Sequence, residues 1–473
     1  MDERAMASMA SNQQLHEAHG EPYAVARRLA EAFRAEGEEL YLVGGAVRDR
    51  LLGIHDLDID LATSALPDTI VRIGRKVGLG KPHLVGEKFG TVGLETESGR
   101  IEITTYRSEE TYLPGSRKPS VKFGSTLLDD LSRRDFTINA MAQDLLTGAI
   151  VDPLRGKPDL EAGLIRAVED PLARFREDPL RLLRGVRLAS RLAFAIEGQT
   201  WHALERAALW LETISRERIR DEYTKILTGP DPVRGLTLLR ESTLLQHSVP
   251  ELLELTQMQD HGPRHPLSLW DHTMRVLAEV PAGLTVRWAA LLHDIAKPAT
   301  RTHEPSGRPR FFHHEELGSR MAREILWGLR YSNQVVEAVS LLIETHMQLH
   351  SYSPEWSDGA VRRLMLRLGP SLGDAILLAR ADAAGHAFGT PSADRPKFDH
   401  LEARIRDLDR VQVETLQSPL TGHDLMQRYQ RAPGPWIRHI KDTLREEVLE
   451  GHLAPDDRDA AWMIADRLIA SDA

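Results

Sequence analysis

One short stretch, Leu42 to Asp60, constrains how this chain can fold more than any other, and it reads LVGGAVRDRLLGIHDLDID. Its apolar start predicts the end of a buried strand, Gly44 and Gly45 predict a tight turn, and the next residues predict a helix. A glycine pair between a strand and a helix lets backbone N–H groups approach a phosphate closely. Asp58 and Asp60 alternate with apolar residues, which predicts a second strand with both carboxylates on one side.

These two carboxylates predict a metal site beside a phosphate-binding turn. Carboxylate oxygens on one side of a strand suit Mg²⁺, and the combination is typical of nucleotidyl transfer by two metal ions. Two later alternating segments, Gly86 to Leu94 and Gly99 to Arg107, predict neighbouring strands. Glu102 lies on the second of them and is the candidate third catalytic carboxylate. The alternative is that Glu102 is an ordinary solvated strand residue.

Composition sets the broad class. A chain of 473 residues predicts about three domains at ~150 residues each. No apolar run approaches the ~18 residues that a membrane span needs, so we expect no membrane association. The absence of Cys excludes disulfides and thiolate metal sites, and it favours a cytoplasmic enzyme. Because the net charge is −10, any nucleic-acid surface must be a local basic patch.

The sequence GGAVRD followed by LDID resembles the head of the bacterial class II tRNA nucleotidyltransferase (CCA-adding) and poly(A) polymerase family. Later segments extend the resemblance over roughly residues 22 to 450. It implies a head resembling polymerase beta, in which Asp58 and Asp60 hold Mg²⁺ and act with Glu102 on the tRNA 3′-hydroxyl and the leaving pyrophosphate. It also implies that Gly44, Gly45 and Arg48 contact the nucleotide.

A second signature, LSRRDFTINAMAQD, spans residues 131 to 144 and resembles the RRDFTxNAM motif of the same family. In that family the motif contacts the sugar and phosphates of the incoming nucleotide. The resemblance therefore implies nucleotide contacts for Arg134, Asp135 and Asn139. Read from the residues alone, the same segment could be a capped helix start.

A long helix is predicted from Phe175 to Phe194, with Asp178 as its N-cap and Pro179 in its first turn. Asp178 and Arg181 are three residues apart and share a helix face, where they offer an acceptor and a forked donor to a nucleobase edge. The alternative is a surface salt bridge between them.

The sequence EDPLR, residues 177 to 181, resembles the family motif EDxxR, whose Asp and Arg select CTP and ATP over UTP and GTP. Arg184 and Arg187, in the following turns, are further candidate nucleotide contacts. The segment SRERIRDEYTKIL resembles the next family motif. Its Glu217, Arg218 and Glu222 are expected to brace the helix that selects the base.

A different pattern fills the middle of the chain, where histidines and aspartates recur at the ends of apolar segments. His272, the pair His293 and Asp294, and Asp382 resemble the metal ligands of the HD phosphohydrolase superfamily. Two further histidines are candidate additional ligands, and a lysine follows the His-Asp pair as it often does in that superfamily: His314, His346 and Lys297. The resemblance implies a divalent transition metal and a phosphatase or phosphodiesterase acting on 2′,3′-cyclic phosphates or 3′-phosphates of RNA ends. The alternative is a degenerate HD domain with a structural role.

The expected fold class is therefore α+β, with an αβ head followed by helical regions. The predicted parts are a disordered extension (1–21), the nucleotidyltransferase head (22–165), a helical neck with the base-selecting motif (166–250), an HD domain (251–395) and a helical tail that binds tRNA (396–473). The expected partners are the 3′ end and acceptor stem of tRNA, CTP and ATP. The sequence leaves the oligomeric state open.

Four alternative functions follow from the same residues. A full-length predicted loop at residues 108–120 favours an enzyme able to add A, but nothing separates A-only from complete CCA addition. A poly(A) polymerase is disfavoured because GEKFGTVGL replaces the basic stretch typical of those enzymes. The third alternative is an HD phosphohydrolase whose head only binds RNA, and a weaker one is a nucleotide-sensing regulator.

Overall fold

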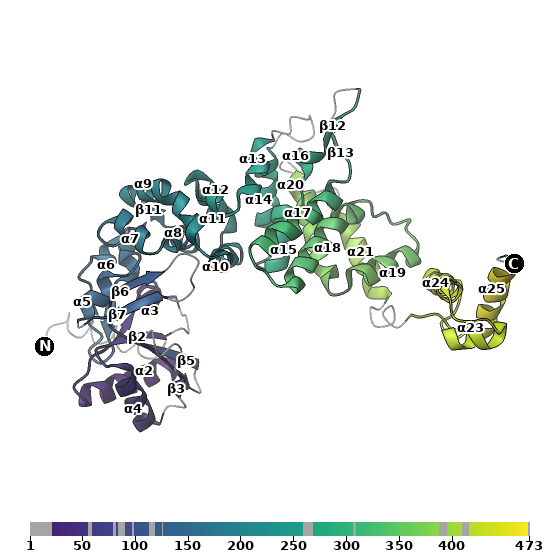
Figure 1. Cartoon of the computed structure of the whole chain (residues 1–473). Coiled ribbons are helices and arrows are strands. Elements are labelled where there is room, and N and C mark those ends of the chain that lie inside the picture. Colours follow the sequence, from purple (N-terminus) through teal and green to yellow (C-terminus); the bar gives the residue numbers. More distant parts are fainter. Residues whose placement is uncertain are drawn as a thin grey trace. The chain divides into compact units, whose positions relative to one another are not determined.

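The computed structural model describes residues 21–54, 59–78, 82–83, 90–96, 99–112, 119–124, 126–258, 268–305, 309–386, 395–408 and 416–471 (Figure 1). Asp58 and residues 1–20 of the predicted extension (1–21) lie outside the described residues. The chain divides into two compact units, Met1–Pro250 and Glu251–Ala473. No described helix combines the length and the apolar character that crossing a bilayer requires.

A seven-stranded mixed sheet organises the first unit, with the order β3-β4-β5-β2-β1-β8-β9. Its strands are β1 (Leu40–Val43), β2 (Ile59–Thr63), β3 (Pro82–His83), β4 (Thr91–Thr96), β5 (Gly99–Thr105), β8 (Ala142–Asp144) and β9 (Ile150–Val151). β2 and β5 pair in parallel, and the other neighbouring strands pair antiparallel. Side chains alternate along β2 as predicted, since Ile59 and Leu61 are buried while Asp60 between them is exposed.

Helices surround this sheet and continue beyond it within the first unit. They are α2 (Glu21–Ala35), α3 (Gly45–Leu51), α4 (Pro67–Val77), α5 (Leu127–Ser132), α6 (Gly156–Glu161), α7 (Pro171–Glu177), α8 (Leu180–Leu192), α9 (Gly198–Ala207), α10 (Arg216–Leu227), α11 (Pro232–Glu241) and α12 (Leu244–Ser248). Single turns of 3₁₀ helix lie at Thr137–Asn139, Ala208–Thr213 and Pro250–Leu253, and the short strands β10 (Leu164–Ile165) and β11 (Ala195–Ile196) pair in parallel.

The prediction of one helix from Phe175 to Phe194 is wrong, because α7 and α8 are separate helices. Asp178 lies between them with an extended backbone (φ −148°, ψ 99°), the conformation that a residue before proline favours. Its Oδ1 accepts a hydrogen bond of 3.1 Å from the N–H of Leu180, so it still satisfies the first turn of α8. Because of this break, Asp178 belongs to neither helix, and its Oδ2 can accept a hydrogen bond from a different partner.

The predicted loop at residues 108–120 is also wrong in part. β6 (Arg107–Tyr112) and β7 (Pro119–Phe123) form an antiparallel hairpin, in which Thr111 faces Ser120. The loop prediction gave weight to the Pro and Gly residues of the segment. The β-branched and aromatic residues on either side of them favour strands. Residues 113–118 lie outside the described part of the chain.

The second unit is helical, with one small hairpin of β12 (Arg301–His303) and β13 (Pro309–Phe311). Its helices are α13 (Glu254–Gln257), α14 (Leu269–Glu279), α15 (Leu284–Leu292), α16 (Lys297–Thr300), α17 (His314–Gly328), α18 (Asn333–His350), α19 (Asp358–Leu368), α20 (Leu372–His386), α21 (Arg395–Asp407), α23 (Gly422–Tyr429), α24 (Pro435–Glu450) and α25 (Arg458–Ser471). α14, α15 and α18 pack against α20, and α17 packs along α18 (Figure 1). α23, α24 and α25 enclose a separate apolar cluster around Trp436 and Leu444.

Candidate active site and metal centre

A cleft of about 730 Å³ lies within the first unit, between the turn before α3, the segment after α5, and the helices α8 and α10. All ten residues predicted to contact a nucleotide line it: Gly44, Gly45, Arg48, Arg134, Asp135, Asn139, Asp178, Arg181, Arg184 and Arg187. Asp60 lines the same cleft. Residues from three separate sequence motifs therefore converge on one concave surface.

Gly44 occupies a position in this cleft that no other residue could take without distortion. Its φ is +71°, which side chains disfavour, and a Cβ there would lie 2.5 Å from Nη1 of Arg134. Arg134 is held in place by Asp130, whose Oδ2 accepts its Nη2 at 3.0 Å. The glycine therefore allows a guanidinium to lie directly against the turn.

Asp135 and Asn139 connect the segment after α5 to its neighbours. Asp135 accepts hydrogen bonds from Nδ2 of Asn139 at 3.1 Å and from Nε of Arg184 at 2.7 Å. Asn139 accepts in turn from Nη1 of Arg48 at 2.5 Å. Burial alone would raise the pKa of Asp135, but Arg184 and Asn139 outweigh it and hold that pKa well below its usual range. Asp135 is therefore an anion throughout the physiological range.

Asp178 and Arg181 both line the cleft, but they are paired with other residues rather than with each other. Oδ2 of Asp178 accepts from Nη2 of Arg218 at 2.6 Å. Arg181 donates to Glu177 at 3.0 Å and to the carbonyl of Arg133 at 2.8 Å. The described structure thus contains a braced acceptor and a braced donor side by side, and not the surface salt bridge weighed as the alternative.

Of the three residues expected to brace α8, Glu222 contacts the helix itself and Arg218 contacts Asp178 just before it. Arg218 binds Asp178 as described, and Oε1 of Glu222 accepts from Nη1 of Arg187 at 3.1 Å. Both contacts come from α10, which packs against α8. Glu222 is 3% exposed, so the pair is shielded from water and holds Arg187 in a defined orientation.

The lining of the cleft is strongly basic although the whole chain is acidic. Among its described lining residues, nine are basic: Arg48, Arg133, Arg134, Arg181, Arg184, Arg187, Arg191, Arg218 and Lys225. Four are acidic: Asp49, Asp60, Asp135 and Asp178. Burial lowers the pKa of Lys225, an effect that the nearby Glu222 opposes. This excess of positive charge is the local basic patch that the net charge required, and it suits a polyanionic ligand.

Asp60 and Glu102 are neighbours because β2 and β5 pair in parallel with these two residues opposite each other. Paired residues on adjacent strands place their side chains on the same face. Asp60 lines the cleft, whereas Glu102 is paired with Arg100 at 3.0 Å and its side chain is 41% exposed. The described residues therefore supply two adjacent carboxylates at the edge of the basic cleft.

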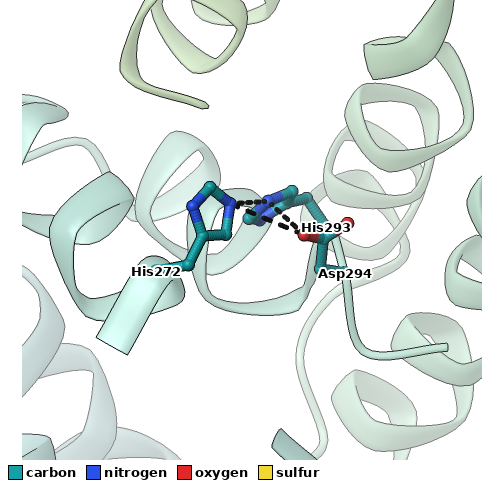
Figure 2. Close-up of side chains that lie close together, drawn as sticks. All are labelled: His272, His293 and Asp294. Carbon is teal, nitrogen blue, oxygen red and sulfur yellow. Dashed lines mark hydrogen bonds and ion pairs between the residues drawn. The ribbon is translucent and has the colours of Figure 1, made fainter. Parts of the chain in front are cut away.

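In the second unit, the predicted ligands His272, His293 and Asp294 meet in the core (Figure 2). Nε2 of His293 lies 3.1 Å from Oδ2 of Asp294 and 3.3 Å from Nε2 of His272. Asp382, from α20, lies with its Oδ1 3.1 Å from Nε2 of His272. All four residues are at most 5% exposed. Segments far apart in the sequence thus converge on one ligand set.

A second group of potential ligands shares Asp294 and consists of Asp294, His314 and His346. His314 and His346 each direct Nδ1 to a backbone carbonyl, at 2.8 Å and 2.5 Å. A carbonyl only accepts, so Nδ1 carries the hydrogen and Nε2 of the neutral ring carries a lone pair. The two Nε2 atoms nevertheless lie 3.2 Å apart. Two facing lone pairs are unfavourable unless a cation lies between them, so these residues fit a divalent metal.

The electrostatics of this centre favour metal ligation. Burial lowers the pKa of His346 to about 3, and the adjacent His293 adds to the effect, so the ring is neutral at physiological pH. Burial alone would raise the pKa of Asp294, but His293 and Lys297 hold it well below its usual range. Lys297 lies 2.6 Å from Oδ2 of Asp294. The neutral imidazole of His346 and the ionised carboxylate of Asp294 are in the protonation states that a metal requires.

Two contributors were not predicted. Nε2 of His350 lies 2.7 Å from Oδ2 of Asp382, the oxygen that faces away from His272. Its spacing of four residues from His346 on one helix is the signal that could have indicated it. Asp49, which is 3% exposed and lines the cleft, had no signal beyond its place in GGAVRD, because one of its partners, Arg191, comes from a distant element.

Comparison with known proteins shows which family the chain belongs to. Residues 40–166 match the model for the poly A polymerase head domain, residues 193–255 match the model for the probable RNA and SrmB-binding site of polymerase A, and residues 264–384 match the HD domain. The CCA-adding enzyme of Bacillus pumilus is 32% identical over 441 residues, which cover 92% of this chain and 94% of the relative. The chain belongs to the bacterial tRNA nucleotidyltransferase and poly(A) polymerase family.

Two further members of the family are informative. The A-adding tRNA nucleotidyltransferase of Deinococcus radiodurans is 33% identical over 423 residues, covering 86% of this chain and 90% of the relative. The crystal structure of the Bacillus stearothermophilus CCA-adding enzyme in complex with CTP aligns with a TM-score of 0.71 and 27% identity, covering 96% of this chain and 99% of that one.

Membership of this family makes the chain an enzyme of the nucleotidyltransferase class. The predicted fold class is confirmed: an αβ polymerase head is followed by helical regions and an HD domain. The predicted domain boundaries and the roles assigned to individual residues stay predictions.

Proposed function

We propose that this nucleotidyltransferase adds the 3′-terminal CCA, or its A, to tRNA from CTP and ATP without a nucleic-acid template. The observation that carries the proposal is the basic cleft in which all ten predicted nucleotide contacts meet Asp60. The printed names of relatives with CCA-adding and A-adding activity, and of a related structure in complex with CTP, support the choice of reaction.

In this proposal the arginines of the cleft bind the triphosphate, and Arg48 and Arg134 lie beside the turn at Gly44 and Gly45. Asp58, Asp60 and Glu102 are the catalytic carboxylates. The adjacent oxygens of Asp60 and Glu102 fit Mg²⁺, which when bound supplies charge stabilisation at the attacking and leaving oxygens of phosphoryl transfer. The residues of the chain hold the tRNA 3′-hydroxyl and the α-phosphate in line with each other.

Base choice is assigned to Asp178 and Arg181. A carboxylate accepts from an exocyclic amino group, and a guanidinium donates to a neighbouring ring acceptor. Cytosine and adenine both present that pair of groups, whereas uracil and guanine present a carbonyl where the amino group would be. The contacts from Arg218 and Glu177 hold both side chains in place before the nucleotide binds, which favours discrimination.

The HD domain is proposed as a second, metal-dependent phosphohydrolase centre. His272, His293, Asp294 and Asp382 would hold a divalent transition metal, and His314 and His346 would complete a second group around Asp294. Bound metal supplies Lewis-acid and nucleophile chemistry at a phosphate. Its proposed substrates are 2′,3′-cyclic phosphates or 3′-phosphates on RNA ends, which would otherwise block nucleotide addition.

The test of the transferase uses three tRNA transcripts, ending at the discriminator base, at C and at CC, each incubated with Mg²⁺ and labelled CTP or ATP, separately and together. Growth of all three to a CCA end is expected for a complete enzyme. Addition of A to the CC-ended transcript alone would identify an A-adding enzyme, a second candidate that the Deinococcus relative favours. Absence of incorporation on every transcript would contradict the proposal.

Variants link the activity to the cleft. Asp60→Ala is expected to abolish incorporation, because a metal ligand is removed without changing the fold of an exposed strand position. Glu95→Ala is the matched control, since Glu95 is an exposed carboxylate on β4 of the same sheet and does not line the cleft. Unchanged incorporation by the Asp60 variant would disprove the assignment.

A further inference from the structure

A closed ring of charged hydrogen bonds joins α3, the segment 135–139 and α8. Its members are Asp49 and Arg48 from α3, Asn139 and Asp135 from the segment, and Arg184 and Arg191 from α8. Four of the six, Arg48, Asp49, Asp135 and Asn139, are at most 6% exposed. The ring therefore links the phosphate-binding turn to the helix that follows Asp178 and carries Arg181 in its first turn.

The bonds of this ring fix the role of each member. Asp49 accepts from Nε and Nη2 of Arg48 with its two oxygens, at 2.7 and 2.9 Å, in the bidentate geometry that makes such pairs strong. Arg48 then donates to Oδ1 of Asn139. Arginine has no acceptor, so the Asn139 amide must turn its oxygen to Arg48 and its NH₂ to Asp135. The donors along this path are thus fixed: Arg48 donates to Asn139, and Asn139 donates to Asp135.

Two arginines of α8 close the ring at separate points. Arg184 binds Asp135, and Nη2 of Arg191 lies 3.2 Å from Oδ2 of Asp49. They are seven residues apart, which on an α-helix means the same face and a separation of about 10 Å. A helix held at one point can pivot, but a helix held at two points has its direction fixed as well.

We propose that Asp49 and Arg191 are positioning residues, which set the angle of α8 against the phosphate-binding turn and thereby determine how strictly the enzyme selects its nucleobase. This inference rests on the proposed function, because it assumes that Asp178 and Arg181 read the base. Asp178 lies just before α8 and Arg181 lies in its first turn, so both are on the side of Arg184 that is away from Arg191. A pivot about Arg184 therefore moves the reading groups when the Asp49–Arg191 contact is lost.

Arg181 adds a third contact between α8 and the head, through the carbonyl of Arg133 at 2.8 Å. That bond uses the side chain that reads the base, so it cannot hold the helix independently of the nucleotide. Arg191 is 40% exposed and lies outside the base-selecting motif, and its removal leaves the bonds between Arg48 and Asp49 in place. Replacing Arg191 therefore tests the effect of the angle of α8 while the other bonds of the ring stay in place.

The experiment compares Arg191→Gln with wild type by measuring kcat/KM for CTP and for UTP on a tRNA transcript ending at the discriminator base, and for ATP and GTP on one ending at CC. We expect the preference for the correct base to fall about tenfold, the usual size for loss of one charged hydrogen bond. Arg191→Lys should recover part of the preference, because it restores a cation. A double variant, Asp49→Asn with Arg191→Gln, should select no worse than Asp49→Asn alone.

The matched control is Arg34→Gln, because Arg34 also contacts an aspartate, Asp144, at 3.2 Å, but it does not line the cleft. If Arg191 only contacts a phosphate, Arg191→Gln would lower kcat/KM for all four nucleotides equally. The ratio of kcat/KM between correct and incorrect nucleotides would then be unchanged, and that result would overturn the inference. An equal loss of preference in the Arg34 variant would overturn it too. If the wild-type enzyme incorporates no nucleotide or shows no base preference, the proposed function itself fails. If the wild type is selective and the Arg191 variant is equally selective, only the positioning role is refuted.

Discussion

At the scale of single residues, the cleft depends on a glycine, which has no side chain, as much as on its many charged side chains. Gly44 combines a left-handed backbone with direct contact to Arg134, and both properties exclude a Cβ. Sequence reasoning placed this glycine at a phosphate-binding turn from its neighbours alone. It did not show that the space above the glycine is filled by a guanidinium, because that arginine comes from another motif about ninety residues later.

We expect Gly44→Ala to raise KM for CTP and ATP, because the new methyl group displaces Arg134. Gly53→Ala is the matched control, since Gly53 has the same φ of +71° and nothing within 4 Å of a Cβ placed there. Both variants place a methyl group at a positive φ, and only the methyl group at Gly44 also meets Arg134. Steady-state kinetics with each nucleotide would check this, and equal KM values in the two variants would contradict it.

A second residue-scale prediction concerns Arg218, which holds Asp178. Arg218→Gln should reduce the preference for CTP over UTP while leaving Asp178 itself in the cleft. Removal of the 2.6 Å contact lets the carboxylate rotate, so its orientation is no longer fixed before binding. Competition between labelled CTP and UTP measures the change. Retention of the full wild-type preference would show that Asp178 needs no brace.

At the scale of elements, the sequence predicted several strands and helices from local pattern. Alternation predicted β2 and β5, and the apolar face with its acidic cap predicted α8 in outline. The β6–β7 hairpin was missed because pairing between strands is not visible in a segment rich in turn residues. The ring through Asp49 was missed for a related reason, since its members meet only after α3 and α8 have packed.

The capping box of α23 gives a prediction at this scale. Thr421 accepts from the backbone N–H of Asp424, and Asp424 accepts from the backbone N–H and hydroxyl of Thr421. These bonds lower the pKa of Asp424 to about 2. Because the folded pKa is depressed, the stabilisation is present above about pH 4, the unfolded value, and is lost as the pH falls toward 2.

We therefore expect amide exchange of α23 to accelerate between pH 4 and pH 2 in the wild type, after correction for intrinsic exchange rates. Thr421→Ala should destabilise the helix by about 1 kcal/mol at neutral pH. In that variant the change with pH should be somewhat smaller, because Asp424 loses the hydroxyl bond of Thr421 but keeps the backbone N–H of residue 421 and Arg458. An identical pH dependence in both proteins would contradict this account.

At the scale of the whole molecule, the chain carries two candidate centres in two compact units. The cleft is made entirely by residues of the first unit, and the metal centre entirely by residues of the second. Motif order along the sequence predicted both centres. The detailed pairing inside each, such as His350 with Asp382, required the folded structure.

We predict that the two centres can be disabled independently in the full-length chain. His346→Ala should abolish phosphohydrolase activity and the stabilisation that added divalent transition metal gives to the second unit. It should leave nucleotide incorporation within about twofold of wild type. Asp60→Ala should abolish nucleotide incorporation but keep the phosphohydrolase activity and the stabilisation of the second unit by metal. Differential scanning calorimetry with and without chelator would follow the stability of each unit, and loss of both activities in either variant would refute independence.

The closed ring around Asp49 also has an evolutionary consequence. Each buried member satisfies its neighbours, so replacing one of them leaves another charge or amide unpaired in the core, at a cost of several kcal/mol. Relatives should therefore keep the four buried positions together or change them together, as a covarying set. Arg191 is the partly exposed member, and a lysine could replace it there without leaving a buried charge uncompensated. Lineages that differ in nucleotide fidelity should diverge at this position before they diverge within the ring.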